Sequence, residues 1–281
     1  MLEVIQETIV DSVKLLPFLF LTFLLLEYIE HKMIKKNQNI IKKSGKFGPL
    51  LGGVLGIFPQ CGFSVAATNL YAARIITIGT LISIYLTTSD EMLPIMLSQN
   101  MDIKIILKIL FLKLIIGIFY GFVVDFIFRK KNNEKNTISS FCDEEHCDCK
   151  HSLLRSSLKH TLNIFAFIIC ASFVLNILIC FIGEDNLSSL FTKNSFFGPI
   201  ISSLIGLIPN CASSVIITEL YLENIISVGS MLSGLLTGSG VALIVLFRVN
   251  KNKKENLQII SIIYSFGVIS GTIMNMLGLH F

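Results

Sequence analysis

An internal repeat connects the two halves of this chain. Residues 47–93 align without a gap with residues 197–243, at an offset of 150 and with 19 of 47 positions identical. The most distinctive matched element is FPQC at 58–61, which returns as IPNC at 208–211. Two copies of an apolar segment interrupted by proline are typical of transport proteins whose halves share a central site.

The distribution of apolar residues indicates a membrane protein. Hydrophobic residues make up 53% of the 281 residues and charged residues 15%, and the apolar ones form long blocks. A helix of about 20 apolar residues crosses the hydrocarbon core of a bilayer. Acidic residues precede the first block where a signal peptide would carry basic ones, so we expect this block to be retained. We expect an all-α integral membrane protein, with candidate spans at 9–29, 75–99, 103–128, 161–182, 225–247 and 257–280.

Basic residues gather in three loops. Residues 30–46 contain six lysines, 129–160 contain seven basic residues and 248–255 contain four, together 17 of the 23 lysines and arginines. Cytoplasmic loops of membrane proteins carry such an excess, so we expect these loops inside and both termini outside. Positive charge confined to loops between spans gives no reason to expect a nucleic-acid partner.

The predicted orientation makes the two halves run in opposite directions through the membrane. The first membrane repeat, 1–128, begins outside and ends inside, and the cytoplasmic loop 129–159 joins it to the second, 160–281, which does the reverse. Each unit must therefore cross an odd number of times, so we expect two inverted-topology repeats. The simplest count gives each unit about three full spans plus a broken re-entrant helical hairpin. Five short segments per unit have the same parity and are the alternative.

The break in each repeat follows from the chemistry of its residues. Pro59 has no amide hydrogen and its ring clashes with the preceding turn, and Gly56 and Gly62 lower the helix propensity further. A weaker interruption is expected where TTSD at 87–90 corresponds to TGSG at 237–240. Backbone groups left unsatisfied in lipid are costly, so such breaks persist only inside protein or beside a water-filled cavity. We therefore expect them at the centre of the protein.

Two cysteines at the breaks suggest a soft ligand set. A half-helix that begins near Cys61 or Cys211 directs its positive end there, and two thiolates select soft ions such as Zn, Cd, Hg, Cu(I) or trivalent arsenic. Oxygen and amide groups within a turn or two complete the candidate substrate site: Gln60, Asn210, Ser64, Ser214, Thr68, Thr218 and Asn69. Alternatively, the cysteines act as small apolar residues, and the hydroxyl residues serve packing and backbone satisfaction.

Two carboxylates extend the candidate substrate site. Glu219 corresponds to Asn69 and Asp90 corresponds to Gly240, so each places a charge on one side of an otherwise symmetric arrangement. Ionisable residues at membrane depth are costly and are therefore functional candidates. Either carboxylate could neutralise a cation or carry a proton, and Asp90 could instead belong to an external loop.

The loop between the units contains a second cluster of metal-binding side chains. Three cysteines and two histidines fall within ten residues: Cys142, His146, Cys147, Cys149 and His151. Four of them could bind a soft divalent ion tetrahedrally, with a spacing that is not that of a zinc finger. The alternative is a solvated acidic linker, but disulfides cannot explain three thiols in a cytosolic loop.

These features resemble the ten-transmembrane heavy-metal exporter family. The resemblance rests on the FPQC and IPNC elements, His160-Thr161 at the start of the second unit, the Leu-Pro-Phe span that ends in Glu27, and the Cys/His-rich loop. It implies export of a metal or metalloid across the bacterial inner membrane, with members named as manganese or arsenic efflux permeases. The two cysteines favour the soft end of that range over manganese.

Two other classes of protein stay open. Permeases for sulfur oxyanions such as thiosulfate have a related architecture, and helix N-termini at the centre would also suit an anion, although the metal-binding loop argues against this class. A membrane thiol oxidoreductase could use Cys61 and Cys211, but the chain has no CxxC motif. Because the chain also has no Walker-type lysine loop, we expect a transporter that is not an enzyme and has no cofactor. Its expected partners are the substrate and membrane lipid, and self-association into a homo-oligomer is open.

Overall fold

The computed structural model describes residues 20, 21, 24, 47–57, 61–89, 92–128, 158, 161, 162, 165, 166, 170 and 197–278. Every regular element in these ranges is an α-helix. The first unit contributes α3 (Gly48–Gly56), α4 (Cys61–Ala72), α5 (Ile78–Thr87), α6 (Met92–Ser98) and α7 (Ile103–Phe128). The second contributes α11 (Gly198–Gly206), α12 (Cys211–Leu222), α13 (Val228–Thr237), α14 (Ala242–Val249) and α15 (Lys253–Met276). The all-helical prediction is confirmed for this part of the chain.

Each helix of the first unit begins 150 residues before its counterpart in the second, from α3 and α11 through to α7 and α15. The structural repeat is therefore longer than the sequence repeat, which ends at residues 93 and 243. The last pair of helices keeps its register with few shared side chains. Gly117 and Gly121 of α7 are matched by Gly267 and Gly271 of α15, and these glycines pack against α5 and α13 respectively.

Helix boundaries are set by the same devices in both units. Pro49 and Pro199 stand in the first turn of α3 and α11, where a missing amide hydrogen is not needed. Thr77 caps α5 by accepting a hydrogen bond from the Thr80 amide at 3.1 Å, and Ser227 does the same for α13. After α4 and α12 the chain turns through a left-handed residue, Arg74 with φ 58° and Asn224 with φ 58°.

Close contacts between small residues give the directions of the helices. A Cβ at Gly48 would lie 2.2 Å from Thr80 Oγ1 and one at Gly56 would lie 2.0 Å from Thr87 Oγ1, so α3 and α5 run parallel. Gly79, at the start of α5, lies against Gly121, near the end of α7, so α7 runs antiparallel to both. Since α3 and α5 point the same way, α4 must return the chain between them. The second unit repeats these contacts with α11, α13 and α15.

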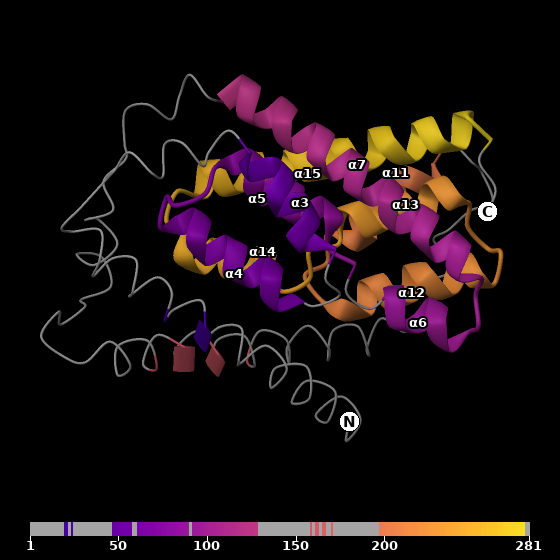
Figure 1. Ribbon diagram of the computed structural model, residues 1–281, viewed down its shortest axis with the longest axis horizontal. Coiled ribbons are helices and arrows are strands. Elements are labelled where there is room, and N and C mark those ends of the chain that lie inside the picture. Colours follow the sequence, from indigo (N-terminus) through magenta and orange to yellow (C-terminus); the bar gives the residue numbers. More distant parts are fainter. Residues whose placement is uncertain are drawn as a thin grey trace, which may run out of the picture.

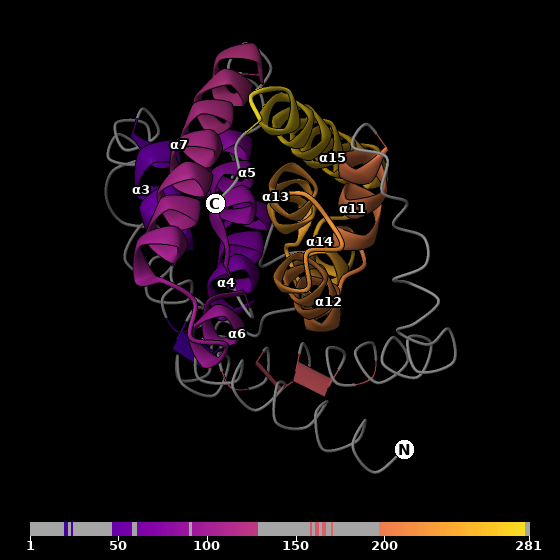
Figure 2. The same cartoon turned by 90° about the vertical axis from the view of Figure 1, so that its right-hand side faces the viewer.

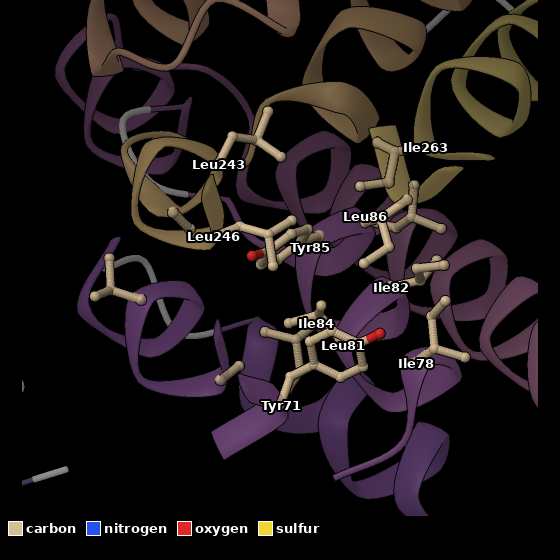
Figure 3. Packing of buried hydrophobic residues seen from close by; sticks show 14 of the residues in the cluster. Tyr71, Ile78, Leu81, Ile82, Ile84, Tyr85, Leu86, Leu243, Leu246 and Ile263 are labelled. Carbon is tan, nitrogen blue, oxygen red and sulfur yellow. The ribbon is translucent and has the colours of Figure 1, made fainter. Parts of the chain in front are cut away.

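The two units pack against each other reciprocally. Helix α4 of the first unit packs on α14 of the second, and the counterpart of α4, α12, packs on α6, the counterpart of α14 (Figure 1). Figure 2 shows α3, α5 and α7 beside α11, α13 and α15. Each of the two apolar cores mixes residues of both units. In one of them, Leu243, Leu246 and Ile263 of the second unit meet Tyr85 and Leu86 of α5 (Figure 3).

Equivalent positions touch where α7 meets α15. The Ser270 hydroxyl lies 3.3 Å from that of Tyr120, and these two residues are 150 positions apart. The Tyr120 ring also stacks on Phe266 with 3.9 Å between ring centroids. A contact between a residue and its own repeat counterpart is expected where a two-fold axis relates two units.

Within the described residues, three segments are long and apolar enough to cross a membrane: Ile103–Phe128, Val228–Val249 and Lys253–Met276. Large apolar side chains on α7, such as Phe111, Phe119 and Phe126, are exposed, as expected for lipid contact. Two predicted spans are interrupted inside, 75–99 between α5 and α6 and 225–247 between α13 and α14. Most of the predicted spans 9–29 and 161–182 lies outside the described residues.

Candidate functional site

Two interruptions of each unit lie side by side. Helix α3 ends at Gly56 and α5 ends at Thr87, and a Cβ at Gly56 would lie 2.0 Å from Thr87 Oγ1 and 2.9 Å from the Ile84 carbonyl oxygen. In the second unit, a Cβ at Gly206 would lie 2.3 Å from Thr237 Oγ1. Glycine is required at these two positions because the end of α3 touches the end of α5, and the end of α11 touches the end of α13. The break between α3 and α4 therefore lies at the same level as the break after α5.

Hydroxyl groups satisfy backbone carbonyls around these interruptions. Thr87 Oγ1 donates to the Ser83 carbonyl at 2.9 Å, and Thr88 Oγ1 donates to the Ile84 carbonyl at 2.7 Å. Thr237 Oγ1 donates to the carbonyl of Ser203, on the neighbouring helix α11, at 3.0 Å. The Ile84 and Ser203 carbonyls also accept the Thr88 and Leu207 amides, so these additional bonds give the buried hydroxyls hydrogen-bond partners.

Lys113 joins the interruptions of the two units. Its side chain is 1% exposed, and its ammonium donates to the carbonyl of Thr88, which follows α5, and to that of Leu235 in α13 at 3.1 Å. Among the residues that the structure describes, it is the only buried charged side chain. Sequence reasoning missed it because it lies within the apolar block 103–128. The signal was present, since an ionisable residue in the middle of a span is a functional candidate by default.

The predicted polar residues of α4 are buried. Thr68 Oγ1 lies 2.7 Å from the Ser64 carbonyl and 2.5 Å from the hydroxyl of Tyr85, a fully buried residue of α5. Asn69 donates to the Val65 carbonyl at 3.1 Å, whereas its buried Oδ1 accepts no hydrogen bond from the residues that the structure describes. An unsatisfied buried amide oxygen is costly. This part of the site therefore has an acceptor to offer.

The second unit arranges its polar residues in a related way. Thr218 and Ser214 are buried on α12, and Thr218 donates to the Ser214 carbonyl at 2.7 Å. Asn210 is the residue that precedes the first turn of α12 and is buried. Ser214 approaches the break after α13, because a Cβ at Gly238 would lie 3.0 Å from its hydroxyl. The hydroxyl of Ser239, in that break, is buried and has no hydrogen-bond partner in the described part of the chain.

Glu219 differs from its counterpart in burial. Its side chain is exposed on α12, whereas Asn69 is buried on α4. Other predicted site residues lie outside the described part of the chain: Gln60, Asp90, Cys142, His146, Cys147, Cys149 and His151. Cys61 and Cys211 begin α4 and α12, and their side chains also lie outside what is described. Within the described residues, no group of three His, Cys, Asp or Glu side chains could hold a metal ion.

The ends of four helices give this region its electrostatic character. Helices α4 and α12 begin at the interruptions, so their unpaired amides and positive dipole ends lie there. Helices α5 and α13 end there and direct carbonyls toward the same region. The Lys113 ammonium donates to two of these carbonyls, those of Thr88 and Leu235. The region can therefore bind small polar species through amides, hydroxyls and carbonyls.

The sequence matches one protein family over nearly its whole length. The family is described as "Putative, 10TM heavy-metal exporter", and the match covers residues 1–184 and, in an overlapping second stretch, 166–280. No curated protein and no solved structure matches the chain. The apolar helices and the family together identify a multi-pass membrane transporter with a metal or metalloid substrate. The chain therefore belongs to the ten-transmembrane heavy-metal exporter family.

Proposed function

We propose that the protein exports a soft metal ion or a trivalent arsenic species through the region where the interruptions of both units meet. The observation that carries this proposal is that Lys113 bonds to carbonyls at the broken ends of α5 and α13, one from each unit. Broken helices in a membrane are tolerated around cavities and substrate paths. The family of the chain supplies the class of substrate.

The transport path runs between two inverted repeats, 1–128 and 160–281, that rock against each other. Reciprocal packing of α4 on α14 and α12 on α6 supports this two-fold relation. The parallel directions of α3 and α5 support a re-entrant hairpin, since α4 must then return the chain to the side from which α3 began. The loop 129–159 faces the cytoplasm of a bacterial cell and both termini face outward, as the basic loops predict.

Ligands for the substrate come from the two helix N-termini and the hydroxyls behind them. Cys61 and Cys211 bind the soft ion, and Gln60 and Asn210 stand next to them in the sequence. Ser64, Thr68, Ser214 and Thr218 lie on the helices that follow, and Asn69 Oδ1, which has no partner among the described residues, supports a polar lining. Glu219 and Asp90 balance charge during exchange, and the five Cys and His residues of the loop collect metal before transport.

A sulfur oxyanion permease is the second candidate. The buried ammonium of Lys113 and the positive ends of α4 and α12 would suit an anion as well as a neutral arsenic hydroxide. The metal-binding loop has no evident use in such a permease. The two candidates are separated by testing both substrates on the same cells.

The deciding experiment measures element content. Cells that express the protein should survive higher arsenite or cadmium and contain less of that element, with thiosulfate uptake unchanged. Ser substitution of Cys61 or Cys211 should abolish this protection while the protein still reaches the membrane, and Cys170→Ser, at an exposed position, is the control. The permease is favoured if expression increases thiosulfate uptake and leaves the cellular contents of arsenic, cadmium, zinc, mercury, copper and manganese unchanged.

Two further variants test the supporting residues. Replacing Cys142, Cys147 and Cys149 together with Ser should change the apparent affinity for metal and leave maximal flux intact. Glu219→Gln should slow net export and flatten its pH dependence while substrate exchange continues. An unchanged pH profile in that variant would reduce Glu219 to an exposed residue of α12.

A further inference from the structure

Lys113 lies where a cation would be expected to bind. The Thr88 carbonyl belongs to the residue that follows the last turn of α5, and the Leu235 carbonyl lies in the last turn of α13. Carbonyls at helix C-termini lack the amide partners of a continuing helix and carry the negative end of the helix dipole. The two helices present these oxygens to one point from different units of the protein.

The ammonium at this point is isolated from water. Lys113 is 1% exposed, with its Nζ on the Thr88 carbonyl and 3.1 Å from the Leu235 carbonyl. An ammonium is a compact charge with three donors, and backbone carbonyls are the groups that replace the hydration shell of monovalent ions in protein sites. Lys113 stands four residues before Gly117 on α7, and a Cβ at Gly117 would lie 2.4 Å from Thr87 Cγ2 at the end of α5.

The equivalent position of the second unit carries no charge. Ile263 stands 150 residues after Lys113, is fully buried, and packs in the apolar core beside Leu86 (Figure 3). The repeated fold is therefore compatible with an apolar residue here, and the lysine is not a general requirement of the helix arrangement. The two carbonyls, one from each unit, are among the specific partners of its ammonium.

We propose that these carbonyls form a monovalent-cation site and that the Lys113 ammonium is a cation permanently tethered in it. The tether supplies the positive charge that holds the broken ends of α5 and α13 together at the centre of the protein. The wild-type protein therefore needs no sodium or potassium to keep this arrangement. This inference concerns an internal ion and holds whichever substrate the protein exports.

The test removes the tether and supplies free ions. Lys113→Ala, Ile263→Ala and the wild-type protein are purified in detergent, and their thermal stability is measured in the chlorides of N-methylglucamine, sodium, potassium and ammonium. Lys113→Ala should melt about 5 °C lower than wild type in N-methylglucamine, because two buried carbonyls lose their donor. Ammonium, or a metal ion of fitting size, should restore most of this loss in a saturable way.

The controls separate a cation site from a packing defect. Ile263→Ala also leaves a buried cavity, but its stability should not depend on which cation is present, and neither should that of the wild type. An equal loss of stability for Lys113→Ala in all four salts overturns the proposal. If Lys113→Ala gives no folded protein, Lys113→Arg and Lys113→Met are compared. Arg should fold better than Met, and a Met variant as stable as the Arg variant overturns the proposal as well.

Discussion

The two units share a scaffold and differ in their charges. Ser83 donates to the Pro49 carbonyl at 2.7 Å in the first unit, and Ser233 donates to the Pro199 carbonyl at 2.7 Å in the second. Helix starts, caps and the left-handed turn after α4 and α12 also coincide at the offset of 150. These shared features are those that bring helices close together and satisfy their ends. They define what both halves need in order to pack.

Some differences between the units compensate each other. Gly52 of α3 faces Ile84 of α5, with 3.0 Å from a Cβ at Gly52 to Ile84 Cγ1. In the second unit the larger residue has changed sides, because Ser202 of α11 faces Gly234 of α13, with 2.4 Å from a Cβ at Gly234 to Ser202 Oγ. The space between the helices is thus filled by one side chain in either case, as close packing requires.

Other differences have no compensating partner and place charge on one side of the pseudo-axis. Lys113 corresponds to Ile263, and Asp125 corresponds to Asn275. The Arg74–Glu255 ion pair links the units at one end, whereas its equivalent positions are Asn224 and Ile105. A duplicated scaffold can therefore carry single-copy charges, and these mark the places where the units have separate tasks.

The largest effect should come from breaking the shared scaffold. A Cβ at Gly79 would lie 2.2 Å from the Gly121 carbonyl oxygen, and one at Gly229 would lie 2.3 Å from that of Gly271. Backbone cannot yield easily, so Gly79→Ala and Gly229→Ala should each cost about 3 kcal/mol of stability and reduce the yield of monodisperse protein. Ser265→Ala, on the exposed face of α15, is the control. A large loss for only one of the two glycines would contradict the equivalence of the units.

Exchanging the central charge should have the next largest effect. Lys113→Ile copies the second unit into the first and should cost about 2 kcal/mol, because buried carbonyls lose a charged donor. Adding Ile263→Lys should recover part of this loss, since the equivalent carbonyls belong to Gly238 and Tyr85. Thermal melts of the wild type, both single variants and the double variant give the coupling between the sites. Purely additive losses would mean that the second unit has no equivalent cation position.

A smaller effect is expected where the helix starts are tied to the last helix of each unit. Asp125 Oδ1 accepts the Gly79 amide at 2.8 Å and Oδ2 accepts the Thr77 hydroxyl at 2.7 Å, whereas Asn275 accepts the Ser227 hydroxyl at 2.8 Å. Asp125→Asn copies the second unit and should lower stability by about 1 kcal/mol, because a carboxylate near a helix N-terminus is lost. Asp125→Ala should cost more. Equal melts for the Asn and Ala variants would show that the hydrogen bonds are unimportant.

The smallest effect should come from the ion pair between the units. Arg74 bonds both Glu255 oxygens, at 2.6 and 2.9 Å, and Tyr71 donates to the same carboxylate. A hydrogen bond to Glu255 raises the pKa of the Arg74 guanidinium, which stays charged at every usable pH. Both side chains are partly exposed, so a double-mutant cycle with Ala should give a coupling of about 1 kcal/mol. The same cycle on Asn224 and Ile105 should give none, and an equal value there would remove the asymmetry.

The repeat, the membrane location and the proline-centred breaks were predictable from the sequence. Each depends on local chemistry: matched letters at one offset, runs of apolar residues, and the inability of Pro59 and Pro209 to continue a helix. The spans 103–128 and 257–280 were predicted as parts of the two repeats, but the exact register of α7 and α15 was not, because few residues are identical there. The exposure of Glu219 and the burial of Asn69 were also invisible, since equal positions in a repeat can face different surroundings.

What the sequence determined by itself is that two broken apolar segments exist in this protein and recur 150 residues apart. Only the tertiary structure decided that the break after α3 touches the break after α5, and that Lys113 joins α5 to α13. The physical reason is the distance along the sequence over which each feature is determined. A break is caused by residues next to each other in the chain, whereas a bond across 122 positions depends on how whole helices pack.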